Sequence, residues 1–247
     1  MTVPSPASLP PPEKKPFRDR NLQIIFGVTL MAIMGVSSIT PAFPTIIREL
    51  SITPERIGLL ITFFTLPGVI LSPVLGVLAD RYGRKRILGP SLILFAVAGV
   101  GCGLVRSFDW LLVLRTFQGI GAASLGSINT TIIGDLYTGP RRAEAMGYNA
   151  SVLSLGTASY PAIGGALALL GWYYPFFLPV LALPVGFLVL AKLNSPEPRS
   201  EQGLKDYLGG TWQHLKDVRV WALFGAGTVT FILLYGTLLT YFTLMLA

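Results

Sequence analysis

Long runs without Asp, Glu, Lys or Arg dominate the chain, and their lengths fit membrane helices. Four uninterrupted runs of 19 to 28 residues cover residues 21–47, 57–79, 87–105 and 220–247. A membrane helix needs about 20 apolar residues to cross a hydrocarbon core about 30 Å thick. Each of these runs therefore predicts one membrane-spanning helix.

Two further runs complete the pattern. Residues 110–134 are interrupted only by Arg115, and residues 145–191 form a run too long for one span. Gly171 and Pro175 enclose an aromatic group near the middle of the longer run, which predicts a turn at the membrane interface and a helix on each side. The sequence thus predicts six helices within residues 21–193 and a seventh within 220–247.

The basic residues predict the orientation. Of the 19 Lys and Arg residues, 15 lie in the N-terminal tail and in alternate loops, whereas the other loops hold only Arg48, Arg56 and Arg106. Cytoplasmic loops collect Lys and Arg, so we expect a cytoplasmic N-terminus in a multi-pass plasma (inner) membrane protein. Residues 1–20 contain six prolines and no apolar signal region, which predicts a disordered cytoplasmic arm.

Composition narrows the function classes. Hydrophobic residues make up 52% of the chain and charged residues 13%, against about 25% charged in soluble domains. The net charge of +7 would suit nucleic acid only if the basic residues shared a soluble face, and here they lie in short breaks between apolar runs. One cysteine, Cys102, and one histidine, His214, do not make a metal centre. We therefore expect no nucleic acid, no metal, no cofactor and no enzyme activity.

The polar stretch 194–219 separates the sixth and seventh predicted helices. Its apolar residues recur at helical spacing, which favours an amphipathic linker on the cytoplasmic surface. The adjacent Gly209 and Gly210 leave an ordinary flexible loop as the alternative. Because the chain stops at Ala247 within apolar residues, we expect it to be a truncated chain, in which residues 220–247 begin a missing C-terminal half.

A repeated pattern links the two halves of the 21–193 region. Gly-x4-Pro-x2-Gly occurs at residues 68–76 and again at 156–164, and similar hexapeptides close the first and fourth helices at 45–50 and 131–136. The offsets are 88 and 86 residues, and the related helices have opposite orientations. A three-plus-three inverted repeat of this kind is typical of secondary transporters. Chance recurrence of Gly and Pro is the alternative.

The loop after the second predicted helix reads GVLADRYGRKRIL. Asp80 closes one helix and Arg84 opens the next, so both charges oppose the helix dipoles and need partners. Gly76 would permit close helix approach and Gly83 a left-handed turn. As a basic cluster alone, the loop would be a positive-inside anchor. With its glycines and aspartate it resembles the signature loop of the major facilitator superfamily, a resemblance carried by Gly76, Asp80, Arg81, Gly83, Arg84, Lys85 and Arg86.

The resemblance extends along the chain. The segment 111–123 is similar to the family's fourth-helix motif, and 156–165 is similar to the fifth-helix motif of antiporters, except that Tyr160 stands where the family has Gly. The matching residues are Arg115, Gln118, Gly119 and Gly121, then Gly156, Pro161, Gly164 and Gly165. The resemblance implies an all-α polytopic fold in which a six-helix N-terminal bundle is followed by the linker and one further helix.

Arg115 is the one ionisable residue well inside a predicted span, and such residues are expensive enough to suggest function. Gln118 and Asn129 fall within about 60° of it around the helix, a polar stripe that suits a wet cavity. The alternative is that Arg115 extends to the outer headgroups. By resemblance, Arg115 belongs to substrate or proton coupling, and Asp135 joins Asp80 and Arg84 in a charge relay. A carboxylate at the membrane boundary is the other interpretation of Asp135.

Small polar residues and prolines modify two other helices. Ser37, Ser38 and Thr40 lie near two prolines in the outer half of the first helix, where they either line the cavity or serve packing. In the fifth helix, Pro161 and the glycines after it permit a bend and close packing, with control of leak or exchange as the functional alternative.

We therefore expect a secondary transporter that moves a small organic solute by alternating access, as a drug or metabolite exporter or antiporter. A sugar or metabolite importer and a truncated, non-transporting fragment are the alternatives. The expected partners are the small-molecule substrate, membrane lipids and the missing half. A coupling proton stays open because residues 21–47 contain no acidic residue.

Overall fold

The computed structural model describes residues 16–194 and six positions between 218 and 229, and every regular element in these parts is a helix. The chain divides into two units, residues 1–199 and 200–247. The expected N-terminal arm lies outside the described residues apart from residues 16–20. Nearly all of the linker and most of the seventh helix lie outside them too. Val218, Trp221, Ala222, Gly225, Ala226 and Val229 are helical.

The first predicted span consists of three pieces. After the short 3-10 turn η1 (Pro16–Arg18), helix α1 (Arg20–Ser37) starts at Asp19, whose carboxylate accepts a hydrogen bond from the Asn21 backbone N–H at 2.9 Å. A 3-10 turn, η2 (Thr40–Ala42), and a short helix, α2 (Phe43–Glu49), follow. Pro41 and Pro44 lie at the starts of these pieces, where a missing N–H costs least.

The second and third spans form a hairpin. The short α3 (Pro54–Ile57) leads into α4 (Leu59–Tyr82), and α5 (Arg84–Leu104) follows after a single residue, Gly83. Gly83 has a backbone φ of +98°, which residues with a Cβ rarely adopt. The positive φ that a left-handed turn requires is present at Gly83, but its ψ of +132° lies outside the left-handed helical region.

The fourth span is broken into α6 (Phe108–Ala122) and α7 (Leu125–Leu136), with a turn at Ala123 and Ser124. The corresponding turn in the first span is at Ser38 and Ile39, 85 residues earlier. This spacing is close to the 86-residue offset of the sequence repeat. The two related helices are therefore interrupted at nearly equivalent positions.

The long apolar run reverses where the sequence predicts. Helix α8 (Gly139–Ala168) ends before Gly171, and the chain returns through η3 (Tyr174–Leu181) and α9 (Ala182–Lys192). Within the described residues, five segments are long and apolar enough to cross a membrane. Helix α8 is not among them, although it has 30 residues, because serines, threonines and glycines lower its hydropathy. Its membrane crossing stays a prediction.

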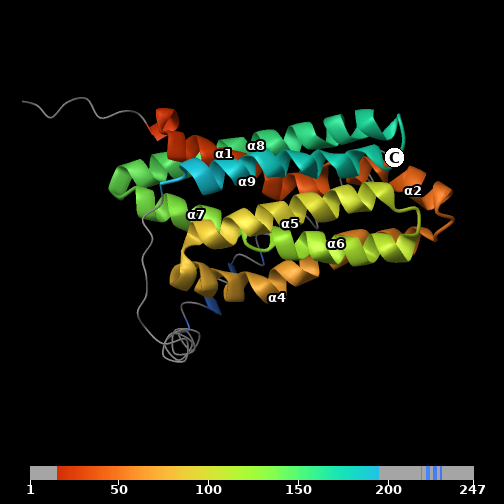
Figure 1. Ribbon diagram of the computed structural model, residues 1–247, viewed down its shortest axis with the longest axis horizontal. Coiled ribbons are helices and arrows are strands. Elements are labelled where there is room, and N and C mark those ends of the chain that lie inside the picture. Colours follow the sequence, from red (N-terminus) through yellow and green to blue (C-terminus); the bar gives the residue numbers. More distant parts are fainter. Residues whose placement is uncertain (1–15, 195–217, 219–220, 223–224, 227–228, 230–247) are drawn as a thin grey trace, which may run out of the picture. The chain divides into compact units, whose positions relative to one another are not determined.

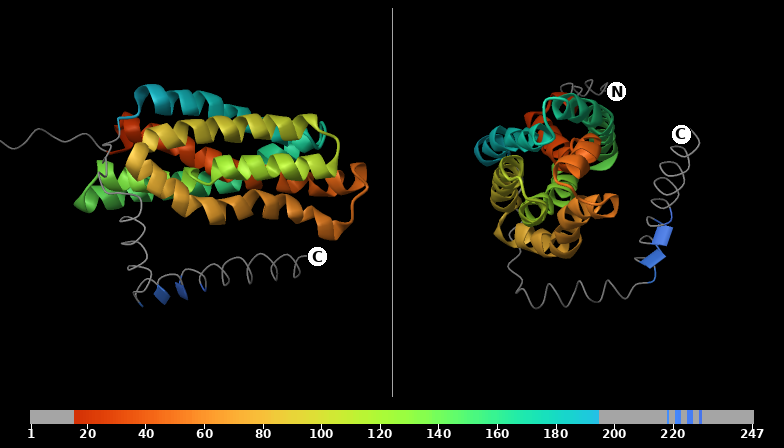
Figure 2. Two further views of the ribbon diagram at one scale, coloured as in Figure 1. Left: turned by 60° about the horizontal axis from the view of Figure 1, so that its bottom comes forward. Right: turned by 90° about the vertical axis from the view of Figure 1, so that its right-hand side faces the viewer.

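The helices run back and forth along one bundle in unit 1 (Figures 1 and 2). Helix α1 packs against α7, α8 and α9, while α5 packs against α6, η3 and α9, and α4 packs mainly against α6. We call the end of the bundle that holds the start of α1, the α4–α5 turn and the α7–α8 turn the basic end. Arg48, Arg56 and Arg106 lie at the opposite end.

Candidate functional site

Arg115 lies where α1, α4 and α6 meet, and its side chain is completely buried. Its guanidinium donates hydrogen bonds to the backbone carbonyls of Leu60 at 3.1 Å and Gly35 at 2.8 Å, and to Gln118 Oε1 at 2.8 Å. The ring of Phe64 covers it at 4.3 Å. The side chain therefore points into the bundle, not along the helix toward headgroups as the alternative interpretation required.

Glycines bring these helices close enough for such contacts. A Cβ at Gly119 would collide with the backbone of Phe64 in α4, and a Cβ at Gly121 would lie 2.6 Å from the Phe95 backbone nitrogen in α5. A Cβ at Gly35 would press on the Phe64 ring at 2.6 Å. Glycine at these positions allows α6 to approach both neighbours and seats the aromatic ring over the arginine.

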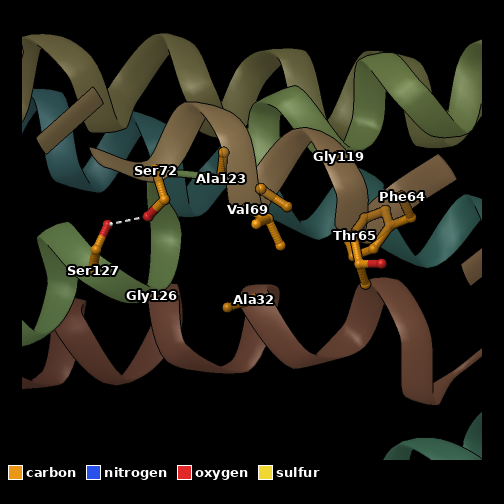
Figure 3. Close-up of a pocket in the computed structure, with 11 residues that line it drawn as sticks. Ala32, Phe64, Thr65, Val69, Ser72, Gly119, Ala123, Gly126 and Ser127 are labelled. Carbon is orange, nitrogen blue, oxygen red and sulfur yellow. Dashed lines mark hydrogen bonds between the residues drawn. The ribbon is translucent and has the colours of Figure 1, made fainter. Parts of the chain in front are cut away.

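A pocket of about 410 Å³ opens beside this junction (Figure 3). Its polar side chains are hydroxyls, and Ser72 donates a hydrogen bond to Ser127 at 3.2 Å across α4 and α7. The rest of the lining is apolar or glycine. The lining residues are Ala32, Phe64, Thr65, Gly68, Val69, Ser72, Gly119, Ala122, Ala123, Gly126 and Ser127.

The structure brings only part of the predicted polar stripe to this pocket. Gly119 lines it, whereas Arg115, Gln118 and Asn129 lie behind the wall, and Phe64 belongs to both the wall and the arginine site. The described pocket therefore does not confirm the expectation that the polar stripe faces a wet cavity. The helix break turns the chain between Gly119 and Asn129, so uniform helical spacing misplaces the later residue.

Asn129 instead takes part in a buried chain of polar side chains. It donates from Nδ2 to Thr29 Oγ1 at 2.5 Å, and Thr29 donates to Asn149 Oδ1 at 2.6 Å. This chain connects α7, α1 and α8. Buried hydrogen bonds between helices position them relative to one another, and the sequence interpretation missed Thr29 and Asn149 as partners.

A charged cluster lies at the basic end. Arg84 is buried and pairs with Asp80 at 3.3 Å and with Asp135 in α7. The structure thus brings together the three residues that the resemblance assigned to a charge relay. Two carboxylates around one guanidinium offset the unfavourable placement of the charges at the helix ends.

The other residues of this loop behave differently. Arg81 and Arg86 are exposed, and Lys85 is half-buried. The expected close helix approach at Gly76 is not found among the described residues, because a Cβ there would meet no described atom within 4 Å. Gly76 instead lines a narrow gap of about 40 Å³ beside Asp80 and Arg84.

In the fifth-helix motif, Gly164 is the residue in closest contact. A Cβ there would collide with the backbone carbonyl of Ser38 at the break in α1, while Gly165 and Gly156 have only looser neighbours. Ser38 is itself buried and donates to the Met34 carbonyl at 2.7 Å, so it packs and does not line the described pocket. Pro161 lies inside α8 and is exposed.

The N-terminus of α1 is tied to the end of α7. The Tyr137 hydroxyl donates to Asp19 Oδ2 at 2.6 Å. Burial and this hydrogen bond to a carboxylate raise the pKa of Tyr137 above its ordinary value of 10.0. Sequence reasoning missed this contact, because it joins residues 118 positions apart.

Within residues 16–194 and the six later positions, no group of three or more His, Cys, Asp or Glu side chains is placed to hold a metal. The site therefore consists of an apolar pocket with hydroxyls, a buried arginine behind its wall and a charged cluster at one end. Together with the polytopic bundle, this arrangement is typical of membrane transport proteins.

Comparison with known proteins supplies the family. The model of the Major Facilitator Superfamily matches residues 25–247, and the chain belongs to that superfamily. It is 32% identical to Multidrug resistance protein 1 of Bacillus subtilis over 181 residues, which are 73% of this chain and 46% of the relative. It is 26% identical to the Quinolone resistance protein NorA of Staphylococcus aureus, over 76% of this chain and 48% of the relative.

Solved structures support the fold. The human organic anion transporter MFSD10 matches with a TM-score of 0.64 and 20% identity, over 76% of this chain and 51% of that one. A D-xylose–proton symporter matches with a TM-score of 0.59 and 18% identity, over 85% of this chain and 55% of that one. The chain spans about half the length of these proteins. It is a transporter-family protein and not an enzyme.

Proposed function

We propose that this chain binds a small organic solute in the pocket between α1, α4 and the α6–α7 break, as part of a secondary transporter. The observation that carries the proposal is the pocket itself, which has a drug-sized volume and an apolar lining with three hydroxyls. Helix interruptions beside the pocket support it, because transporters place substrate sites at discontinuous helices.

The binding proposal is tested by filling the pocket. Gly126 lines it, and a Cβ there meets no described atom within 4 Å, so Gly126→Leu projects a side chain into the pocket without a backbone clash. Gly147→Leu is the matched control, since Gly147 has the same free surroundings in α8 but does not line the pocket. Binding of radiolabelled biphenyl-4-carboxamide to the chain in lipid nanodiscs should fall at least tenfold only in Gly126→Leu. Equal binding in both variants would contradict the proposal.

We further propose export of a drug-like or metabolite solute as the physiological direction. The motif 156–165 and two relatives named for drug resistance support this direction. A sugar or metabolite importer is the second candidate, supported by the three hydroxyls of the pocket, which can hydrogen-bond to a polar substrate. If the direction is export, cells that express the complete transporter should accumulate less labelled probe than vector controls. Uptake of the probe down its outside gradient would favour the importer.

Transport itself, we propose, needs a second six-helix half, because alternating access requires two bodies that move against each other. The relatives, about twice as long as the matched region, support this requirement. Proteoliposomes that hold the 247-residue chain alone should bind the probe without net flux. Flux should appear when sequence encoded beyond codon 247 supplies five further spans. Flux by the monomeric chain alone would refute the requirement, and an immediate stop codon would favour the non-transporting fragment.

In this proposal the protein lies in the plasma membrane with its basic end facing the cytoplasm, because cytoplasmic loops collect Lys and Arg. Cysteines introduced singly at Ser8, Ser107 and Ser200 in a Cys102→Ala background test the orientation. An impermeant thiol reagent added to intact cells should label only Ser107→Cys. Labelling of Ser200→Cys from outside would reverse the assignment.

A further inference from the structure

Arg115 carries a positive charge that no acidic residue balances among the described residues. Its hydrogen bonds go to two carbonyls and an amide, and its Nη2 has no described partner. In the printed sequence, all 12 Asp and Glu residues lie outside the six apolar runs. These predicted spans therefore contain one charged residue, Arg115, and its charge is positive.

The charge lies close to the pocket. Phe64 touches the guanidinium with its ring and also lines the pocket, and Gly119, one turn after Arg115, lines it as well. A ligand in contact with the Phe64 ring thus lies roughly 8 Å from the guanidinium, where an effective dielectric constant of about 20 gives a charge effect of about thirtyfold on affinity.

The polar groups of the pocket are compatible with the same sign. Ser127 accepts a hydrogen bond from Ser72 and keeps its own hydroxyl proton for a ligand. Among the described lining residues there is no carboxylate to hold a cation. The hydroxyls can donate to an anion or accept from a cation, so they do not decide the sign of the ligand charge. The field of Arg115 favours an anion and disfavours a cation of the same shape.

We propose that the pocket selects organic anions over organic cations of the same size, with Arg115 as the positioning residue that sets this preference through the Phe64 wall. This inference rests on the proposed solute-binding function and specifies its substrate class. The apolar lining suits the aromatic or aliphatic part of a ligand, and Arg115 determines whether the anionic or the cationic ligand binds more tightly.

Three probes on one scaffold test the preference: biphenyl-4-carboxylate, biphenyl-4-carboxamide and biphenyl-4-yl-trimethylammonium. Binding to the 247-residue chain is measured in nanodiscs of phosphatidylcholine, with empty nanodiscs and Gly126→Leu as blanks. The carboxylate should bind at least tenfold more tightly than the ammonium ion. This ratio should persist between 50 mM and 500 mM salt, because a buried charge is screened less than the exposed basic residues.

Variants assign the preference to one residue. Arg115→Gln should bring the ratio of carboxylate to ammonium affinity to about one, and Arg115→Lys should keep the ratio because it keeps the charge. Arg84→Gln removes another buried arginine and should leave the ratio unchanged. Carboxamide binding reports whether each variant is folded.

The outcomes separate the two proposals. Binding of the carboxamide with equal or reversed affinities for the two ions would overturn the anion preference and leave solute binding intact. A ratio that disappears at high salt, or that survives in Arg115→Gln, would assign the preference to surface charge and overturn the role of Arg115. Absence of pocket-specific binding by all three probes would refute the proposed function, and the inference with it.

Discussion

Two buried arginines of this chain have opposite surroundings. Arg84, at the basic end, lies between Asp80 and Asp135, and both carboxylates are partly exposed. Arg115, in the interior, has carbonyls, an amide and an aromatic ring around it. The first arrangement neutralises the guanidinium of Arg84. The second provides acceptors for most N–H groups of Arg115 but leaves its positive charge unbalanced by any described acidic residue.

The difference teaches how position along a membrane helix determines what a charge can do. Near the bilayer boundary, water can hydrate the outer sides of two carboxylates, so an ion-pair cluster is stable and can break when helices move. In the interior, an additional carboxylate would need its own hydrogen bonds. A single cation held by backbone carbonyls keeps an electrostatic field that would act on a ligand in the proposed binding pocket.

The largest expected effect is the loss of the interior charge. Arg115→Ala in the complete transporter should reduce solute flux to background, because it removes the field and leaves the carbonyls of Gly35 and Leu60 without their donor. Arg115→Lys should recover flux only in part, since lysine lacks the planar fork. Initial rates in proteoliposomes measure this effect. Near-normal flux in Arg115→Ala would contradict a functional role for the interior charge.

A second test measures the coupling in the charged cluster. A double-mutant cycle of Arg84→Gln and Asp135→Asn should give a coupling free energy of about 1–3 kcal/mol. Arg84→Gln removes the arginine partner of Asp135, and Asp135→Asn leaves Arg84 with Asp80 as its remaining carboxylate. Denaturant unfolding of the chain in detergent provides the four stabilities. Additivity within about 0.5 kcal/mol would mean that the pair contributes little and that the two arginine sites differ less than their contacts indicate.

A smaller effect is expected from Asp80→Asn. Asp135 still pairs with Arg84 in this variant, so carboxamide binding in the pocket should change less than about threefold while the inward–outward equilibrium shifts. Protease or thiol accessibility from each side of the membrane reports the shift. Loss of probe binding would show that the cluster and the pocket are not separate, contrary to the comparison.

The smallest effect concerns the other polar link at the basic end. Tyr137→Phe removes the hydrogen bond to Asp19 and should destabilise the chain by about 0.5–1.5 kcal/mol. The raised pKa of Tyr137 means that the folded state holds this proton more tightly than the unfolded state. Its stabilisation is therefore complete below about pH 10 and decreases as the pH rises further.

Melting curves between pH 8 and pH 11 should show an alkaline decrease in stability that is weaker in Tyr137→Phe than in the unchanged chain. Tyr82→Phe, which removes from an exposed tyrosine a hydroxyl that has no hydrogen bond among the described residues, is the matched control. Identical alkaline profiles for all three proteins would contradict a stabilising role of the Tyr137–Asp19 hydrogen bond at the basic end.

Part of the candidate site could be predicted from sequence. Arg115 is the only charge in the apolar runs, and the loop pattern around Asp80 and Arg84 indicates the charged cluster before any coordinates are known. The pocket could not be predicted in this way. Thr65, Ser72 and Ser127 are ordinary hydroxyl residues in the sequence, and only the packing of α4 against the α6–α7 break places them around one space.

The lengths of the apolar runs, their turns and the alternation of basic loops were determined by the sequence alone, because bilayer thickness and loop charge act on each segment separately. The partners of each polar group were decided by tertiary structure. Arg115 bonds to residues 55 and 80 positions away, and the break at Ala123 moves Asn129 from the arginine to Thr29. Such contacts depend on glycines that let particular helices approach, a property of pairs of helices that no single segment contains.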